Sequence, residues 1–234
     1  NEMLVNGRVE ELLNAMWTAK EHKPDGLLDI EDIIEDALKP VEAGLPWMWE
    51  GLNKSSNGRH YGEIVLVGAG TGLGKTDTLL QQADHDITVL GQKVGLFLLE
   101  NDPQEVLKYM AGKHDKRKYY EPNHPDQHDT EAMRKAFKRY SGKCQIYDNF
   151  GLCDWDRIKS KVLYLIQMGY RVFYIDHLTA LATGNPDANE KDVLEYVMAD
   201  VAEFAKRYNV IFHLVSHLTT PAKGSHEEGA VPQI

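Results

Sequence analysis

The stretch GAGTGLGKT, residues 68–76, decides the fold. It follows the apolar run EIVLV at residues 63–67, and Leu79, Leu80 and Ala83 come after it at helical spacing. Glycines in such a loop let backbone N–H groups turn toward phosphate oxygens, and the N-terminus of the following helix adds partial positive charge. The order of strand, glycine-rich loop, lysine, hydroxyl and helix therefore predicts a Walker A phosphate-binding loop.

The residue types in this loop predict its ligands. We expect Lys75 to reach the β- and γ-phosphates of a nucleoside triphosphate, and the Thr76 hydroxyl to hold Mg²⁺. Ala69 stands where the strict pattern has its first glycine. The alternative is an ordinary glycine-rich turn. The predicted ligands of Mg²⁺–ATP, or of another NTP or dNTP, are Gly70, Thr71, Gly72, Leu73, Gly74, Lys75, Thr76 and Asp77.

Two acidic residues follow apolar runs in the way that catalytic carboxylates do in open α/β sheets. Asp176 ends the run Val172–Ile175, which makes it a Walker B candidate for Mg²⁺. Its alternative role is a helix cap or a solvated strand end. Glu100 closes the run Val94–Leu99, where a carboxylate can deprotonate the water that attacks the γ-phosphate. Its alternative role is a surface glutamate that begins a turn.

A histidine follows a fifth apolar run. His217 comes after residues 210–216 and is placed to face the nucleotide. A lone histidine at a strand end is more often structural than functional, so the residue by itself leaves both readings open.

Strands and helices alternate from about Gly44 onward. Short, nearly continuous apolar runs are expected for parallel strands that are covered on both faces. The sequence therefore predicts an α/β fold with a central parallel sheet. Helices are expected around Trp155–Ile166 and Leu194–Ala205, and strands at Ile64–Val67, Val94–Leu99, Cys144–Tyr147, Val172–Ile175 and Val210–Val215.

Residues 1–43 read as an N-terminal helical linker, and residues 44–234 as the core. Leu12, Leu13 and Met16 suggest one short helix, and a second begins near Asp29 and ends at Pro40. This second helix is too short to stand alone, so its apolar stripe must pack either on its own domain or on a neighbouring subunit. The stripe consists of Ile30, Ile33, Ile34, Ala37 and Leu38.

Composition sets wider bounds. The 234 residues carry a formal net charge of −10, which argues against a protein coated in nucleic acid but leaves room for a narrow DNA-contacting loop. We find no apolar run long enough to span a bilayer and no signal peptide, so no membrane association is expected. The two cysteines, without CxxC spacing, favour a reducing cytoplasmic setting and argue against a zinc site.

Four further features receive structural interpretations. The polar segment 114–129 is predicted to be a surface loop. The adjoining basic and aromatic cluster is read as a solvated loop rather than a surface that stacks on nucleic acid. The histidines of this segment lack metal-ligand spacing. Trp47 and Trp49 are read as packing residues. The cluster comprises Lys113, Lys116, Arg117, Lys118, Tyr119 and Tyr120.

Several motifs together resemble a known family. GLPW at residues 44–47, EGL at 50–52, GAGTGLGKT, LFLLEND at 96–102, YIDHL at 174–178 and LVSHLTTPAKGSHEEG at 214–229 agree with it in order and spacing. The chain from about residue 24 to 234 resembles the helicase domain of phage primase-helicases and mitochondrial Twinkle. That domain belongs to the DnaB-like branch of the RecA-type ATPases.

The resemblance implies a RecA-like P-loop NTPase core and roles for single residues. Lys75 and Thr76 match the Walker A pair, Asp176 matches Walker B, and Glu100 matches the catalytic glutamate. His217 matches the histidine that relays the γ-phosphate state to a DNA-binding loop. In that loop Lys223 and Gly224 are the expected DNA contacts, whereas Thr219 and Ser225 stand where some relatives carry lysine.

The resemblance also implies partners and a reaction. We expect a replicative helicase motor that couples NTP hydrolysis to translocation on single-stranded DNA in a homo-oligomeric ring, a hexamer or heptamer, with a primase or polymerase as a possible partner. The stripe Ile30, Ile33, Ile34 and Leu38 is the expected subunit contact.

The core is expected to be C-terminally incomplete and to lack the family's arginine finger, so the isolated chain should turn over nucleotide weakly. The family's primase half has no counterpart here. The alternatives are a RecA- or KaiC-like ATPase, and a nucleotide-binding assembly module without turnover of its own.

Overall fold

The computed structural model describes residues 27–70, 72–149, 153–182 and 189–217. The chain divides into two compact units, residues 1–42 and residues 43–234. The second unit carries the sheet and every residue of the phosphate-binding loop.

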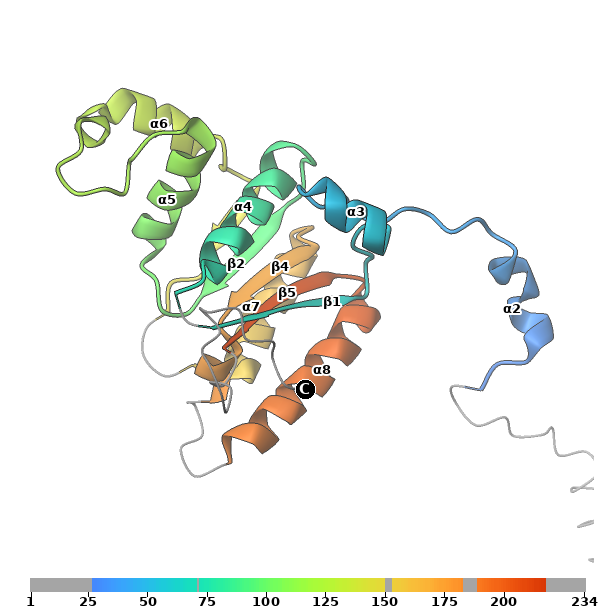
Figure 1. The fold of residues 1–234 in the computed structure, drawn as a ribbon. Coiled ribbons are helices and arrows are strands. Elements are labelled where there is room, and N and C mark those ends of the chain that lie inside the picture. The colour runs from blue at the N-terminus through green and yellow to red at the C-terminus, as the bar shows by residue number, and fades with distance from the viewer. Residues whose placement is uncertain (1–26, 71, 150–152, 183–188, 218–234) are drawn as a thin grey trace, which may run out of the picture. The chain divides into compact units, whose positions relative to one another are not determined.

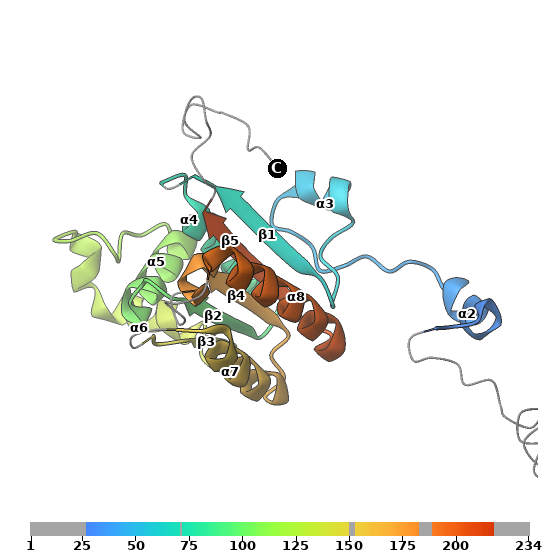
Figure 2. The same cartoon turned by 90° about the horizontal axis from the view of Figure 1, so that it is seen from below.

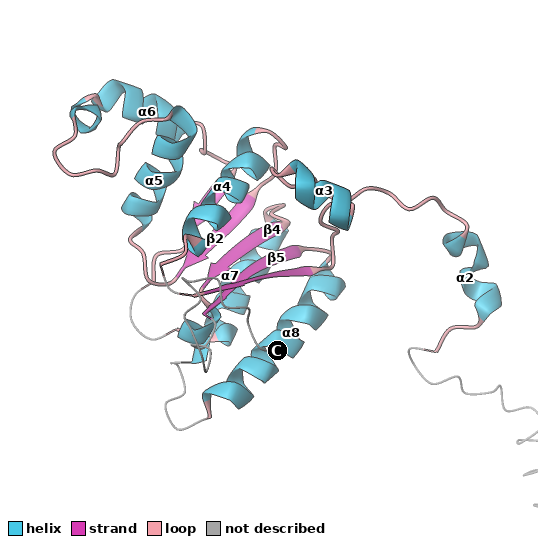
Figure 3. Cartoon of the chain, viewed as in Figure 1, coloured by secondary structure: helices cyan, strands magenta, loops and turns pink. Residues whose placement is uncertain are grey.

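Five parallel strands form the sheet of the second unit (Figure 3). Their order across the sheet is β1-β5-β4-β2-β3. Each predicted apolar run forms one strand, with ends that differ by one or two residues from the prediction. The strands are β1 (Ile64–Ala69), β2 (Val94–Leu98), β3 (Cys144–Ile146), β4 (Val172–Asp176) and β5 (Ile211–His217).

Helices cover both faces of the sheet (Figures 1 and 2). On one face, the hydrophobic core contains side chains of the helix after the phosphate-binding loop and of the next two helices in sequence. On the other face, it contains side chains of the two helices after β3. The first face carries α4 (Lys75–Thr88), α5 (Pro103–Asp115) and α6 (Thr130–Lys138), and the second carries α7 (Trp155–Gln167) and α8 (Glu190–Tyr208). The unit also contains α3 (Glu50–Ser56) and the 3₁₀ helices η1 (Pro125–His128) and η2 (Leu178–Ala182).

Strand β4 shows why the apolar runs are continuous. Successive side chains of a strand point to opposite faces, so a strand covered on both faces needs apolar residues throughout. Phe173 and Ile175 lie in the core beneath α7 and α8, whereas Val172 and Tyr174 lie in the core beneath α4. All five residues of β4 are buried. The strand therefore presents Tyr174 and its terminal aspartate to the P-loop helix.

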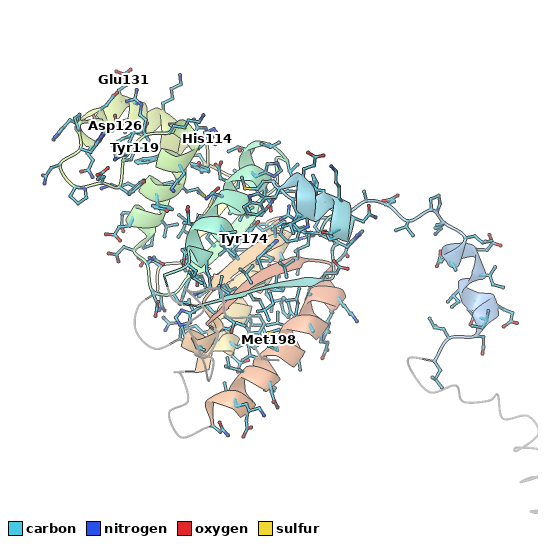
Figure 4. All side chains as sticks on the ribbon, in the orientation of Figure 1. His114, Tyr119, Asp126, Glu131, Tyr174 and Met198 are labelled. Carbon is cyan, nitrogen blue, oxygen red and sulfur yellow. The ribbon has the colours of Figure 1, made fainter. Side chains whose placement is uncertain are left out.

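The segment 114–129 corrects one expectation. It is not simply a surface loop, because residues 125–128 form η1 and Tyr119 is only 1% exposed. The Tyr119 ring packs edge-on against Phe137 of α6, and its hydroxyl donates to Asp115. Burial of the ring beneath α5 and α6 stabilises the loop, so Tyr119 cannot stack on nucleic acid. Figure 4 labels Tyr119 in this region, together with His114 and Asp126.

In the first unit, the structure describes one helix, α2 (Ile30–Ala37). It begins after Asp29 and ends before Pro40, as predicted. Ile30, Ile34 and Leu38 are 66%, 43% and 72% exposed, and Ile33 is half-buried. The predicted helix around Leu12 lies outside the described residues. Within the described ranges, no helix combines the length and apolarity that crossing a bilayer would need.

Candidate nucleotide site

The phosphate-binding loop joins β1 to α4 with two glycines in the left-handed region. Gly72 has φ of 81° and Gly74 has φ of 79°, a conformation that costs glycine little and other residues more. Gly74 is the N-cap of α4, so the first backbone N–H groups of this helix have no partner within it. These groups and the helix dipole favour an anion at this end. Thr71 lies outside the described residues.

Lys75 folds back over the loop. Its Nζ donates to the carbonyl oxygens of Ala69 at 3.0 Å and of Gly70 at 2.6 Å, and the side chain is buried. The ammonium is therefore held at the mouth of the loop, where a phosphate oxygen can replace a carbonyl as its partner.

Thr76 and Asp176 meet although one hundred positions separate them in the chain. Thr76 Oγ1 donates to Asp176 Oδ2 at 2.5 Å, and Asp176 is 8% exposed at the end of β4. A hydroxyl and a carboxylate are the hard oxygen donors that Mg²⁺ prefers, and Mg²⁺ keeps several waters rather than a full protein cage. The pair therefore fits this ion: Thr76 and Asp176 are the residues that would hold it. When bound, Mg²⁺ would neutralise phosphate charge.

Glu100 follows β2, which pairs with β4 so that Leu98 lies opposite Asp176. Its carboxylate is 68% exposed, and Oε2 lies 3.6 Å from Nδ1 of His177. The exposed carboxylate is accessible to water. His177, which directly follows Asp176, is thus a close neighbour of this carboxylate.

A cavity of about 810 Å³ joins these groups. Lys75, Thr76, Glu100 and Asp176 all line it, so one space collects the four side chains that the sequence predicted from three separate strand ends. Gly72 and Gly74 line it as well. The volume lies within the range of ordinary ligand sites, which run from about 300 to 1,000 Å³.

Two other predicted nucleotide ligands occupy less direct positions. Asp77 lines the cavity, but its Oδ2 pairs with Lys113 of α5 at 3.3 Å. An ionised carboxylate and a phosphate oxygen are both hydrogen-bond acceptors and cannot pair. Asp77 would therefore contribute its backbone N–H. Leu73 is 46% exposed beside the glycines.

The predicted relay and DNA residues stand at or beyond the end of β5. His217 is the last residue of β5, and its backbone lies opposite Ala69 in the pairing of β1 with β5. The strand pairing thus brings residue 217 level with the first position of the loop. Lys223 and Gly224 lie outside the described residues.

The cavity has an aromatic end that the sequence pattern did not predict. Tyr109 of α5 and Tyr120 pack with ring centroids 4.7 Å apart, and both line the cavity with Pro122 and Gln127. Tyr109 lies on α5, eight residues after Asn101, and no sequence motif marks it. Only the fold of the segment after α5 places Tyr120 against it.

Comparisons with known proteins agree with this geometry. The chain is 28% identical to a DNA helicase/primase of Enterobacteria phage T3 over 245 residues; the match covers all of this chain and 43% of that protein. Two solved structures share the fold. The ATPase domain of G40P is 21% identical with a TM-score of 0.65, covering 83% of this chain and 72% of that one. A DnaB-like replicative helicase, solved in a study of its interactions with primase, is 22% identical with a TM-score of 0.66, covering 90% and 52%.

These likenesses confirm the predicted RecA-like α/β fold. The family described as "DnaB-like helicase C terminal domain" matches residues 44–228, most of the chain. The match starts one residue after the second unit starts and includes the loop, both strand-end carboxylates and residue 217. The chain belongs to the DnaB-like helicase C-terminal domain family.

Proposed function

We propose that this chain is the motor domain of a replicative DNA helicase, which couples hydrolysis of a Mg²⁺-bound nucleoside triphosphate to translocation on single-stranded DNA and to duplex unwinding. One observation carries the proposal. The Thr76 hydroxyl and the Asp176 carboxylate are hydrogen-bonded at 2.5 Å, on a cavity that Lys75 and Glu100 also line.

Each side chain has a separate task in this reaction. Lys75 and the backbone N–H groups at the start of α4 bind and orient the phosphates. Thr76 and Asp176 hold Mg²⁺. Glu100 accepts a proton from the attacking water, and its exposed carboxylate lets that water enter. His217, at the end of the strand next to β1, is proposed to sense the γ-phosphate and to relay its state to the segment that follows.

Single-stranded DNA is the proposed track, and Lys223 and Gly224 its proposed contacts. One lysine and a few backbone N–H groups give weak, salt-sensitive binding for each subunit. A ring adds such contacts from several subunits. We therefore propose a hexamer or heptamer, to which a primase or polymerase can bind. Replacing Lys223 with Ala should weaken DNA binding and make its dependence on salt shallower by about one unit of slope.

The N-terminal helical linker is proposed to contact a neighbouring subunit and so to close the ring. In α2 and at its C-cap, the apolar residues Ile30, Ile34 and Leu38 are exposed. The acidic residues Glu31, Asp32, Glu35 and Asp36 supply the other face. A stripe of this kind needs an apolar partner surface. In this proposal a neighbouring subunit supplies that surface. The linker of each subunit then stabilises the interface with the next subunit in the ring.

The proposal is tested by measuring nucleotide binding and turnover of the Lys75→Ala variant, with Lys93→Ala as the control. Both lysines donate to backbone carbonyls, Lys93 to Met168 at 2.9 Å, but only Lys75 lines the cavity. Loss of a charge-assisted hydrogen bond to phosphate costs about 1.5–3 kcal/mol, or about ten- to a hundredfold in affinity. Lys75→Ala should lose this affinity for a fluorescent nucleotide, and Lys93→Ala should keep it.

Turnover and unwinding then separate the alternative functions. A helicase motor hydrolyses NTP faster with single-stranded DNA and opens a forked duplex. A RecA- or KaiC-like ATPase would hydrolyse NTP without opening the fork, and an assembly module would bind nucleotide without turning it over. Equal nucleotide affinity in the two lysine variants would contradict all three.

A further inference from the structure

A buried ion pair lies beneath the P-loop helix, away from the cavity. Arg59 is 1% exposed and Asp86 of α4 is fully buried. The guanidinium faces the carboxylate as a fork, with Nη2 to Oδ1 at 2.6 Å and Nη1 to Oδ2 at 2.7 Å. Removing two charges from water is costly, and a pair of hydrophobic residues of similar size would often be as stable. The pair therefore calls for an explanation other than stability.

Both ends of the pair are fully hydrogen-bonded. Asp86 also accepts from the Tyr174 hydroxyl at 2.7 Å and from Nε2 of Gln82 at 2.9 Å. The guanidinium of Arg59 donates to the carbonyl oxygen of Pro46 at 2.8 Å and lies 3.1 Å from Nε2 of His213. Burial lowers the pKa of His213 to about 3, so this ring is neutral. A neutral ring nitrogen can accept from Arg59 without adding charge.

The network joins elements whose far ends form the nucleotide site. Gln82 and Asp86 lie on α4, which begins with Lys75 and Thr76. Tyr174 lies on β4, which ends two residues later at Asp176, and alternation places both side chains on the same face of the sheet. Figure 4 labels Tyr174 at the centre of the fold, where α4 crosses the strands. The helix and the strand are thus joined twice, through Asp86 and Tyr174 inside and through Thr76 and Asp176 at the site.

The same network holds the first segment of the second unit against α4. Leu45 and Arg59 exchange backbone hydrogen bonds at 2.8 and 2.9 Å, and the Met48 N–H donates to Oε1 of Gln82 at 3.0 Å. The contact is close, because a Cβ added at Gly44 would lie 2.5 Å from the Arg59 carbonyl oxygen. Arg59 is therefore fixed by its own backbone as well as by its side chain.

We propose that Arg59, Asp86 and Tyr174 are positioning residues for the nucleotide site, which lock α4 to β4 so that the Thr76 hydroxyl and the Asp176 carboxylate stay in register for Mg²⁺. The inference rests on the proposed NTPase function. None of the three residues lines the cavity, so none is placed to touch a nucleotide bound there. They act by fixing the separation of the two Mg²⁺-binding side chains, and a displacement of about 1 Å in such a site can cost about a hundredfold in rate.

Tyr174→Phe tests the inference, with Tyr140→Phe as its matched control. Each variant removes one tyrosine hydroxyl that donates to an α4 carboxylate at 2.7 Å. The Tyr174 hydroxyl donates to Asp86 in a buried bond, and the Tyr140 hydroxyl donates to Asp84 in a part-buried one. Only the first belongs to the network. Tyr174→Phe should lower kcat about ten- to a hundredfold and raise the Mg²⁺ concentration for half-maximal turnover, while the metal-free nucleotide Kd stays at the wild-type value. Tyr140→Phe should leave all three quantities unchanged.

Urea unfolding gives the free energy of unfolding of both variants, each of which loses one hydrogen bond from a tyrosine hydroxyl to a carboxylate. A loss of kcat that exceeds the loss of stability then indicates positioning. Should Tyr174→Phe fail to fold, Gln82→Met removes one amide from the same network and should shift kcat and Mg²⁺ requirement in the same direction. The inference is overturned if the Tyr174 or Gln82 variant turns over NTP like the wild type, or if kcat falls in both tyrosine variants only in proportion to stability. An assembled wild-type protein without NTP turnover would instead contradict the proposed function, and the inference with it.

Discussion

Thr76 at the start of α4 donates a hydrogen bond to Asp176 at the end of β4, with 2.5 Å between the oxygens. The bond joins the phosphate-binding loop to a strand that lies two positions away from β1 in the sheet, with β5 between them. A hydroxyl and a buried carboxylate in contact at the N-terminus of a helix have the oxygen chemistry that the proposed Mg²⁺ site needs.

Asp176→Asn should raise the Mg²⁺ concentration needed for half-maximal NTP turnover about 10- to 100-fold. Asparagine keeps the size of the side chain but removes the charge that holds a coordinated water. Binding of nucleotide without Mg²⁺ should persist, because Lys75 and the loop are unchanged. The control is Asp154→Asn, since Asp154 caps α7 and asparagine caps as well as aspartate. An unchanged Mg²⁺ requirement in Asp176→Asn would remove this residue from the metal site.

Glu100→Gln should retain nucleotide binding and lose about 10²- to 10⁴-fold in kcat in the assembled protein. The amide has the same shape but cannot accept a proton from water. Glu105→Gln is the control, because this second glutamate lines the same cavity from the first turn of α5. Steady-state phosphate release measures both. Normal turnover in Glu100→Gln would exclude Glu100 as the base.

Replacing both Ile33 and Ile34 with Asp should dissociate any oligomer while the second unit stays folded. Each apolar side chain that is buried in a contact contributes about 1.5–3 kcal/mol, and two added charges reverse that preference. Sedimentation velocity gives the assembly state, and far-UV circular dichroism gives the fold. Glu31→Gln with Glu35→Gln changes the charge of the same helix by two units on its polar face and should leave the sedimentation profile unchanged. Wild-type sedimentation of the isoleucine variant would contradict the subunit contact.

His213 should make stability fall at acidic pH. Burial, and then the positive charge of Arg59, lower its pKa from 6.5 to about 3 in the folded chain. Between these values the unfolded chain binds a proton that the folded chain excludes, so the free energy of unfolding decreases as pH falls below about 6.5 and is unaffected above it. One such group gives a slope of at most about 1.4 kcal/mol per pH unit.

His213→Gln removes that group and keeps a polar side chain beside Arg59. Urea unfolding at pH values from 4.5 to 7.5 should show a shallower decline in the variant than in the wild type. Identical slopes would mean that the histidine is accessible to protons in the folded state.

The site was predictable from sequence to the extent that its chemistry is local. The loop glycines, Lys75 and Thr76 must be contiguous, because one turn of backbone and one helix end bind the phosphates. Asp176 and Glu100 were predictable because parallel strands end at the same edge of a sheet, so a carboxylate after each apolar run comes near the loop. The length of an apolar run also fixed each strand to within two residues.

Other features depend on packing between distant segments. The basic and aromatic cluster, which begins in the last turn of α5, looked polar in sequence. In the structure Tyr119 is buried against α6 and Tyr120 lines the cavity. His177 lies beside Glu100 only because β2 and β4 are neighbours in the sheet. Linear spacing carries no signal for contacts of this kind.

The amino-acid sequence by itself determined the phosphate-binding loop, the alternation of strands and helices, and the carboxylates at the strand ends, because each depends on residues that are adjacent or regularly spaced. Only the tertiary structure decided which buried charges meet. Arg59, Asp86, Tyr174 and His213 come from four separate segments, and burial makes each of them costly unless the others are in place. Such a network is defined by three-dimensional proximity, which no periodicity along the chain records.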